Sequence, residues 1–241
     1  MRDYSEQILA GEGKDDYARY MRTDTLLSLQ RSPEEVVHRD ELLFQVVHQT
    51  TELWLKLACS ELVEATTAIG EGEVDRGIEL LRRAALGVEL ITGQLDMMRF
   101  LSPWDFQTIR TILGHGSGAD SPGWRSVKLC SRQLGIAFQT YIDRHAIDLA
   151  EVYRTGQYTE PYRLAEAMIA WDEQVSLYRV QHYKVITRII GNGVVGTQGT
   201  QVEVLTRLIE YKYFPELWAL RTELTRTGPM GDYHRGAEAV R

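Results

Sequence analysis

Residues 161–190 read PYRLAEAMIAWDEQVSLYRVQHYKVITRII and form the most regular stretch of the chain. Apolar and aromatic side chains, with one histidine among them, recur at alternating steps of four and three residues. Such alternation keeps one stripe of a helix facing the interior of a bundle. The stripe consists of Leu164, Met168, Trp171, Val175, Tyr178, His182, Val185 and Ile189. The stretch therefore predicts a long core helix that carries the imidazole of His182 on its buried face.

The same periodicity predicts helices on both sides of this one, and no series of short alternating strands occurs. Two glycine-rich segments, 114–123 and 191–200, are expected to be loops, and loops of this kind often carry function. The sequence thus predicts an all-α helical bundle. The expected helices before residue 161 are 24–31, 40–68, 73–100, 103–113 and 124–153, and a last helix passes through Leu205, Leu208, Ile209 and Tyr213.

Length and composition favour one domain over residues 1–241, because 241 residues with 44% hydrophobic content suffice for a real core. The 27 Lys and Arg against 34 Asp and Glu give a net charge of −7, which argues against nucleic acid or an anionic membrane as partner. No apolar run has the roughly 18 residues of a membrane span, and residues 1–6 lack a signal-peptide pattern. We therefore expect a cytoplasmic protein.

Four familiar kinds of site lack their sequence signatures. Cys59 and Cys130 form no CxxC or Cys/His cluster, so structural zinc and covalently attached haem are not indicated, and both residues are expected to be small buried side chains. A di-iron bundle needs two Glu-x-x-His motifs, and only Glu35 to His38 matches. The glycines of 114–118 follow an expected helix instead of a strand, which is the wrong context for a dinucleotide-binding loop.

Two histidines and one arginine each have more than one interpretation. His182 is either a core histidine bonded to protein or water, the commoner case, or the proximal ligand of a haem. His48 shares a helix face with Phe44 and is either structural or a proton acceptor at the rim of an aromatic pocket. Arg110, four residues after Phe106, is a solvated charge, a helix cap or a fork for a carboxylate. Periodicity alone does not distinguish between these interpretations.

Taken together, these segments resemble the tryptophan 2,3-dioxygenase family, within the haem-dependent aromatic oxygenases. Residues 39–57 read RDELLFQVVHQTTELWLKL and are similar to the family's DE-L-F-x-x-x-HQ-x-x-ELW-x-K signature. The segment 17–27 resembles the family's Y-x-x-Y-L…LD-x-LL pattern. Residues 102–118 are similar to its FxxxR helix and SSG loop, and 182–197 to its haem-histidine helix and GTGG loop.

The resemblance implies a role for each matching position. His182 would be the axial ligand of the iron of haem b, and His48 would be the catalytic group beside the indole N–H of L-tryptophan, with O2 as second substrate. Arg110 would bind the substrate carboxylate. The remaining substrate-binding residues would be Phe44, Phe106, Ser117, Thr197, Tyr17, Tyr20 and Met21.

The family arrangement also implies an oligomer. Residues 1–32 would form an N-terminal arm, whose Tyr17, Tyr20 and Met21 complete the site of a neighbouring subunit. The expected assembly is a homotetramer or a homodimer. The expected reaction is dioxygenation of L-tryptophan, or a substituted tryptophan, at C2–C3 to an N-formylkynurenine-type product.

Departures from the family pattern keep two alternatives in view. Residues 198–202 read QGTQV where the family has G-G-S-S-G, which alters a loop that closes over substrate. The segment between Gly118 and His182 is also shorter than in typical members. One alternative is therefore a haem monooxygenase that inserts one oxygen atom into tryptophan or a β-methylated analogue. The other is a catalytically silent bundle without haem.

Overall fold

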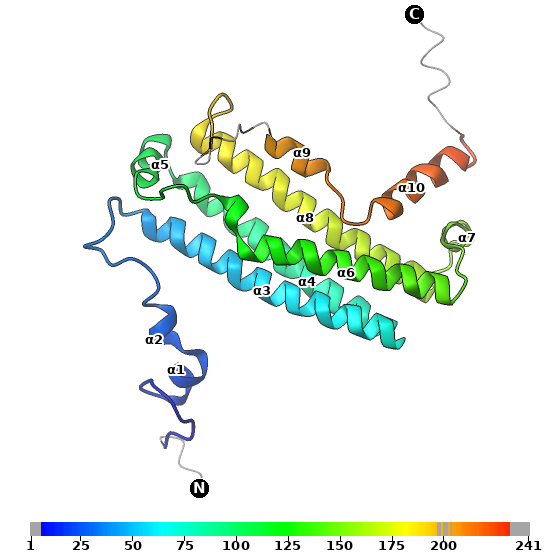
Figure 1. The fold of residues 1–241 in the computed structure, drawn as a ribbon, viewed down its shortest axis with the longest axis horizontal. Coiled ribbons are helices and arrows are strands. Elements are labelled where there is room, and N and C mark those ends of the chain that lie inside the picture. Colours follow the sequence, from blue (N-terminus) through cyan, green and yellow to red (C-terminus); the bar gives the residue numbers. More distant parts are fainter. Residues whose placement is uncertain (1–5, 197–198, 200–201, 203, 232–241) are drawn as a thin grey trace, which may run out of the picture.

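The computed structural model describes residues 6–196, 199, 202 and 204–231. These residues form ten α-helices and two 3-10 helices (Figure 1). In chain order they are α1 (Asp16–Met21), α2 (Thr23–Leu26), α3 (Glu41–Glu71), α4 (Val74–Gln94), η1 (Leu95–Phe100), α5 (Pro103–Arg110), η2 (Gly118–Asp120), α6 (Pro122–Arg144), α7 (Leu149–Thr155), α8 (Glu160–Ile190), α9 (Val204–Glu210) and α10 (Pro215–Thr227). The all-α prediction is confirmed.

Helices α3, α4, α6 and α8 run side by side as an elongated bundle (Figure 1). Helix α3 packs against both α4 and α6, and α4 packs against α8. The main core lies among these four helices and includes the first half of the α8 stripe that the sequence predicted. On α8 the stripe members Leu164, Met168, Trp171 and Val175 are fully buried, each contributing about 1.5–3 kcal/mol of burial free energy.

One buried hydrogen bond joins α6 to α8 across the core. The indole Nε1 of Trp171 donates to Oγ of Ser131 at 3.0 Å, and both residues are completely buried. A buried indole N–H needs such a partner, because an unsatisfied donor costs about 1–3 kcal/mol. The small serine on α6 therefore fixes how the largest side chain of the core is oriented.

A close approach between α3 and the start of α6 requires glycine at position 123. A Cβ atom at Gly123 would lie 2.7 Å from Oε2 of Glu52, 2.7 Å from Cδ1 of Leu55 and 2.8 Å from its Cβ. The backbone N–H of Gly123 donates to Oε2 of Glu52 at 2.9 Å, and the hydroxyl of Ser121 donates to Oε1 at 2.5 Å. Helix α6 is thus anchored to the middle of α3.

A second, smaller hydrophobic cluster closes the end of the bundle where α3 begins and α8 ends. It is formed by residues of α3, η1, α5 and α8. Because α5 is only eight residues long, this contact is what holds it on the bundle. The buried members are Val47, Leu95, Met98, Leu101, Ile109, Val185 and Ile189.

The C-terminal helix is attached to α8 through one buried carboxylate. Asp172 is completely buried and accepts hydrogen bonds from the backbone N–H groups of Tyr213 and Phe214 and from Nε1 of Trp218. The distances to Oδ2 are 3.0, 3.2 and 3.0 Å. Three donors compensate the desolvation of the carboxylate, so α10 is part of the folded unit.

The structure corrects four predicted helix boundaries. The expected helix 124–153 is two helices, because Ala146 adopts φ +48° and Asp148 caps α7. The expected helix 24–31 ends at Leu26 as α2. The last predicted helix ends at residue 210, and Tyr213 lies in the link to the unpredicted α10. Residues 95–100 are a 3-10 helix instead of a continuation of α4.

The first 32 residues contain a helix, α1, that the sequence analysis did not predict. Asp15 accepts from the backbone N–H of Ala18 at 2.8 Å and starts α1. Helices α1 and α2 project from the bundle as an arm (Figure 1). The side chains of Tyr17, Tyr20 and Met21 are 66%, 77% and 52% exposed. Large apolar surface on a projecting arm is typical of a segment that docks on another molecule.

Replacing Gly123 by alanine should destabilise the protein by about 1–3 kcal/mol, because the new methyl group overlaps both Glu52 and Leu55. The measurement is the denaturant midpoint at constant cofactor loading. The matched control is Gly93→Ala on α4, where nothing lies within 4 Å of the added Cβ and helix propensity should give a gain of about 0.5–1 kcal/mol. Equal midpoints for the two variants would contradict the close approach.

Candidate functional site

Five of the residues singled out from the sequence lie at the same end of the bundle. Phe44 and His48 are on the first turns of α3, Phe106 and Arg110 are on α5, and His182 is in the last third of α8. These three helix segments gather where the second hydrophobic cluster lies (Figure 1). Phe44 and Phe106 pack against that cluster, which gives the site a rigid apolar floor.

Aromatic contacts connect α3 to α5. The ring centroid of Phe44 lies 4.2 Å from that of His48, with 31° between the planes, and 6.0 Å from that of Phe106. The (i, i+4) spacing of Phe44 and His48 on one helix face produces the first contact. The second brings an aromatic side chain of α5 to the same place. Phe44, His48 and Phe106 therefore form one aromatic cluster at this end of the bundle, and its Phe44–Phe106 part is called the aromatic wall below.

The hydrogen bond of His48 determines which ring nitrogen remains free. Its Nδ1 lies 2.7 Å from the carbonyl oxygen of Phe44. A carbonyl only accepts, so Nδ1 carries the proton and Nε2 of the neutral ring is left as an acceptor. Desolvation lowers the pKa of His48, opposed by the Phe44 carbonyl and by the charge of Glu52. The ring nevertheless keeps accessible surface, so a ligand can reach it.

His182 lies within protein but has no hydrogen-bond partner for its ring among the residues that the structure describes. Burial lowers the pKa of His182 to about 4, and the charge of His48 contributes in the same direction. Its ring is parallel to that of Tyr178, with an 8° interplanar angle and 5.7 Å between centroids. The imidazole is therefore unprotonated at neutral pH, and its ring nitrogens have no described protein partner.

Arg110 is the last residue of α5 and is half-buried. One of its guanidinium nitrogens donates to the carbonyl oxygen of Val195 at 3.4 Å, which brings the glycine-rich segment after α8 next to α5. Within the described part of the chain no carboxylate forms an ion pair with Arg110. Its remaining donors are thus available to an anionic ligand.

Comparisons with known proteins identify the family to which the chain belongs. The family model described as tryptophan 2,3-dioxygenase matches residues 5–142, which is more than half of the chain. The chain belongs to the tryptophan 2,3-dioxygenase family. It is 31% identical to the tryptophan 2,3-dioxygenase of Caulobacter vibrioides, over 86% of this chain and 98% of that protein. Against the enzyme of Rhodococcus jostii the identity is 28%, over 93% and 94%.

Members of the tryptophan 2,3-dioxygenase family are haem-dependent enzymes, and the residues present fit such a group. A histidine that ligates haem iron must have an unprotonated coordinating nitrogen that is not bonded to protein, and an apolar setting suits such a site. His182 meets these conditions in the described part of the chain. The family-model match ends before α8, so the role of His182 stays a prediction that rests on its geometry and the resemblance.

The other residues that the family resemblance implied are placed less completely. Ser117 follows α5, and its hydroxyl accepts from the backbone N–H of Ala119 at 3.3 Å in a capping box with Asp120. Tyr17, Tyr20 and Met21 lie on the arm. Thr197 lies outside the described residues. Among the described residues, Ser117, Tyr17, Tyr20 and Met21 make no hydrogen bond or ring contact with the aromatic wall within one chain.

Two aromatic residues near His182 were missed as site residues by the sequence analysis. Tyr178 was counted only as a member of the core stripe, and Trp124 was not singled out. The Trp124 ring centroid is 4.4 Å from that of Tyr178, which in turn is parallel to His182. Burial raises the pKa of Tyr178 to about 12, so this phenol stays neutral. The spacing of Tyr178 one turn before His182 was the available signal.

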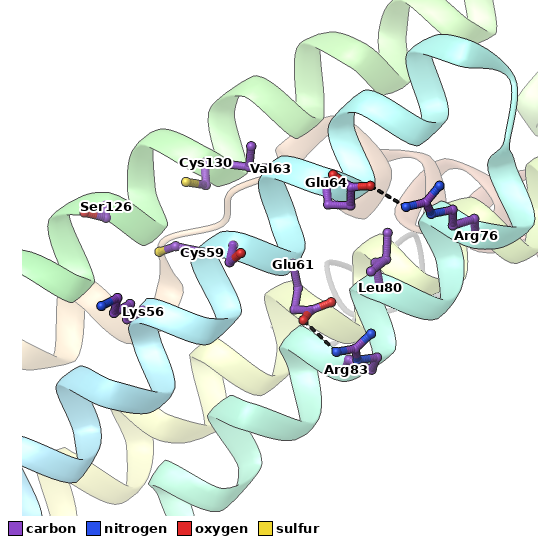
Figure 2. A pocket seen from close by; sticks show the side chains of 11 residues that line it. Lys56, Cys59, Glu61, Val63, Glu64, Arg76, Leu80, Arg83, Ser126 and Cys130 are labelled. Atoms are coloured by element: carbon purple, nitrogen blue, oxygen red, sulfur yellow. Dashed lines mark hydrogen bonds and ion pairs between the residues drawn. The ribbon is translucent and has the colours of Figure 1, made fainter. Parts of the chain in front are cut away.

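The cysteines lie elsewhere, beside a hollow of about 750 Å³ that the side chains of α3, α4 and α6 surround (Figure 2). Cys59 is three helical turns beyond His48 on α3. The cysteines are half-buried, not fully buried as predicted. Burial, with a contribution from the neighbouring Cys130, raises the pKa of Cys59 to about 12.

Four charged residues around the hollow form two ion pairs with one another. Nη2 of Arg76 lies 2.5 Å from Oε1 of Glu64, and Nη2 of Arg83 lies 2.8 Å from Oε1 of Glu61. Dashed lines mark the two pairs in Figure 2. Both ion pairs join α3 to α4, which explains them as structural contacts.

No helix among the described residues has the length and apolar character of a membrane span.

Proposed function

We propose that this protein catalyses the haem-dependent dioxygenation of L-tryptophan at the indole C2–C3 bond. The observation that carries the proposal is the pairing of two recognition groups at one end of the bundle. An acceptor nitrogen on His48 matches the indole N–H, and the guanidinium of Arg110, which forms no ion pair with a carboxylate among the described residues, matches the substrate carboxylate. His48 contacts Phe44 of the aromatic wall and lies close enough to His182 to lower its pKa, and Arg110 is one helical turn after Phe106 on α5.

His182 would be the axial ligand of haem b. The ring has no described protein partner, and its pKa of about 4 keeps a lone pair available at neutral pH. When bound, the ferrous haem supplies the centre that binds O2. The stacked ring of Tyr178 restrains the orientation of the imidazole, and the buried aliphatic residues Val185 and Ile189 exclude water from this end of α8.

His48 would hold the indole and manage its N–H proton. Because Nδ1 is tied to the Phe44 carbonyl, Nε2 can accept a hydrogen bond from the indole nitrogen without any change of tautomer. The lowered pKa of His48 favours the neutral form that this hydrogen bond requires. Phe44 and Phe106 would orient the indole plane by aromatic contact.

Arg110 would fix the amino-acid end of the substrate. A bidentate bond between a guanidinium and a carboxylate contributes about 1.5–3 kcal/mol. The hydrogen bond from Arg110 to Val195 supports this proposal, because it brings the described part of the glycine-rich segment, which ends at residue 196, next to α5. We propose Ser117 and Thr197 as further contacts to the ammonium or carboxylate.

The arm would complete the site of a second copy of the chain. Its residues Tyr17, Tyr20 and Met21 are exposed in the single chain and lie away from the bundle's own site (Figure 1). Burying them against a neighbouring subunit would remove apolar surface from water. We therefore propose a homo-oligomer, a homotetramer or a homodimer, as the active form.

The test of the reaction is the mass of the product formed from L-tryptophan under ¹⁸O2. We expect N-formylkynurenine that carries two labelled oxygen atoms. A β-methylated tryptophan should be assayed in parallel, because a monooxygenase would give a product with one labelled atom from one of the two substrates. A fully haem-loaded, reduced protein that converts neither substrate would contradict the proposal.

His182→Ala should give a protein that is largely colourless but retains its helices, because the proposed axial ligand is lost. The measurements are the haem absorbance per chain and the far-ultraviolet circular dichroism. The matched control is His145→Ala. His145 bonds the backbone carbonyl of Tyr141 at 2.9 Å and caps the C-terminal end of α6. Full haem loading with an unchanged ferrous spectrum in His182→Ala would remove the assignment.

Arg110→Ala should weaken binding of L-tryptophan by about 10- to 100-fold, the equivalent of a lost charge-assisted pair. Tryptamine, which has no carboxylate, should bind nearly as before. Binding is followed by the change in haem absorbance on titration. Arg82→Ala removes an exposed arginine that pairs only loosely with Glu79, at 3.8 Å, and should change neither affinity. Equal losses for both ligands would refute the role of Arg110.

A further inference from the structure

We propose that His38 and Asp105 form a polar link that positions α5 relative to the start of α3. His38 would thereby be a positioning residue for Phe106 and Arg110, with no substrate contact of its own. The inference rests on the proposed function, because it assigns a role to residues that prepare the tryptophan site. The observation behind it is a 3.5 Å contact between Nε2 of His38 and Oδ1 of Asp105.

A backbone hydrogen bond determines which ring nitrogen of His38 carries the proton. The backbone N–H of Asp40 donates to Nδ1 of His38 at 3.2 Å. Nδ1 is therefore an acceptor, and the ring proton is on Nε2. Nε2–H then points its positive end at a carboxylate oxygen. At 3.5 Å the contact is longer than an ordinary hydrogen bond and acts mainly through electrostatic attraction between half-buried groups.

On the α5 side, the Asp105 carboxylate is held at the helix N-terminus. Ser102 donates from its hydroxyl to Oδ2 of Asp105 at 2.6 Å, and the same hydroxyl accepts from the backbone N–H of Asp105 at 3.1 Å. A carboxylate in the first turn is favoured by the helix dipole. Asp105 directly precedes Phe106. An attractive contact at the Asp105 carboxylate therefore restrains the helical turn that carries Phe106.

On the α3 side, the loop that carries His38 is tied to the first residue of the helix. Glu41 is 1% exposed and accepts from the backbone N–H groups of Val37 and His38, the latter at 3.2 Å. Arg31 pairs with the other oxygen of Glu41 at 3.5 Å. His38 is therefore anchored to α3 through its backbone and to α5 through its side chain. This route is independent of the Phe44–Phe106 contact.

A metal site is the competing explanation for this cluster. One ligand atom from each of His38, Asp40 and Asp105 lies within 4.8 Å of the others, and these residue types bind divalent cations. Coordination through Nε2 would move the ring proton to Nδ1, where it would oppose the N–H of Asp40. The hydrogen-bond pattern therefore favours a donor histidine over a ligand histidine.

The test compares His38→Ala with His38→Gln in the haem-loaded protein. His38→Ala should raise the KM and the Kd for L-tryptophan by about tenfold, the cost of a displaced binding group, with kcat changed less than threefold. Gln has an N–H donor that reaches Asp105, so His38→Gln should restore most of the affinity. Glu79→Gln, which changes an exposed surface pair on α4, is the control and should have no effect.

Two further measurements separate positioning from general destabilisation. Hydrogen exchange of residues 103–110 should accelerate in His38→Ala while exchange in α4 stays unchanged. In an Arg110→Ala background, His38→Ala should cost less affinity than it does in the wild-type protein, because one of the two groups that it positions is absent. Treatment of the wild-type protein with a chelator of divalent cations should leave the affinity unchanged.

The outcomes distinguish the inference from the function on which it rests. If the wild-type protein does not bind L-tryptophan, the proposed function fails. If it binds and His38→Ala binds equally well, the positioning role is wrong. Failure of His38→Gln to restore affinity, full additivity with Arg110→Ala, or a loss of affinity on chelation would also overturn it, the last in favour of a metal site.

Discussion

The cluster around Val47, Ile109 and Ile189 is the constraint on which the site depends. Each comes from a different helix, and each helix brings one part of the proposed chemistry to the same end of the bundle. Helix α5 is too short to be stable alone, so its position is determined by what it packs against. Apolar packing therefore sets the spacing of polar groups that do not contact one another directly.

The polar groups of the site are prepared by backbone contacts. A carbonyl oxygen selects the tautomer of His48, and an N–H group selects that of His38. Both selections come from residues close in sequence, so they persist wherever the local turn forms. Desolvation then keeps His48 and His182 mainly neutral at neutral pH. The chain thus defines proton positions before any ligand arrives, which is the preorganisation that electrostatic recognition needs.

The sequence predicted what periodicity and local spacing determine. The stripe of α8 was correct because a long core helix repeats its signal many times, and the Phe44–His48 contact follows from one turn of α3. The break at Ala146 depends on a single residue with a positive φ, which no periodicity reveals. The approach of α5 to α3 involves tertiary contacts, among them the Phe44–Phe106 pair and the proposed link between His38 and Asp105. Those residues are distant in sequence, and no pattern connects them.

The buried carboxylate of Asp172 has a consequence for the chain's C-terminal part. Its three donors all come from residues 213–218, so a protein shortened before Tyr213 would keep an anion inside the bundle with nothing to neutralise it. That anion sits on the same helix as the proposed haem ligand, ten residues earlier. Residues 213–218 therefore compensate a buried charge of α8, and removing them would destabilise the helix that carries the proposed haem ligand.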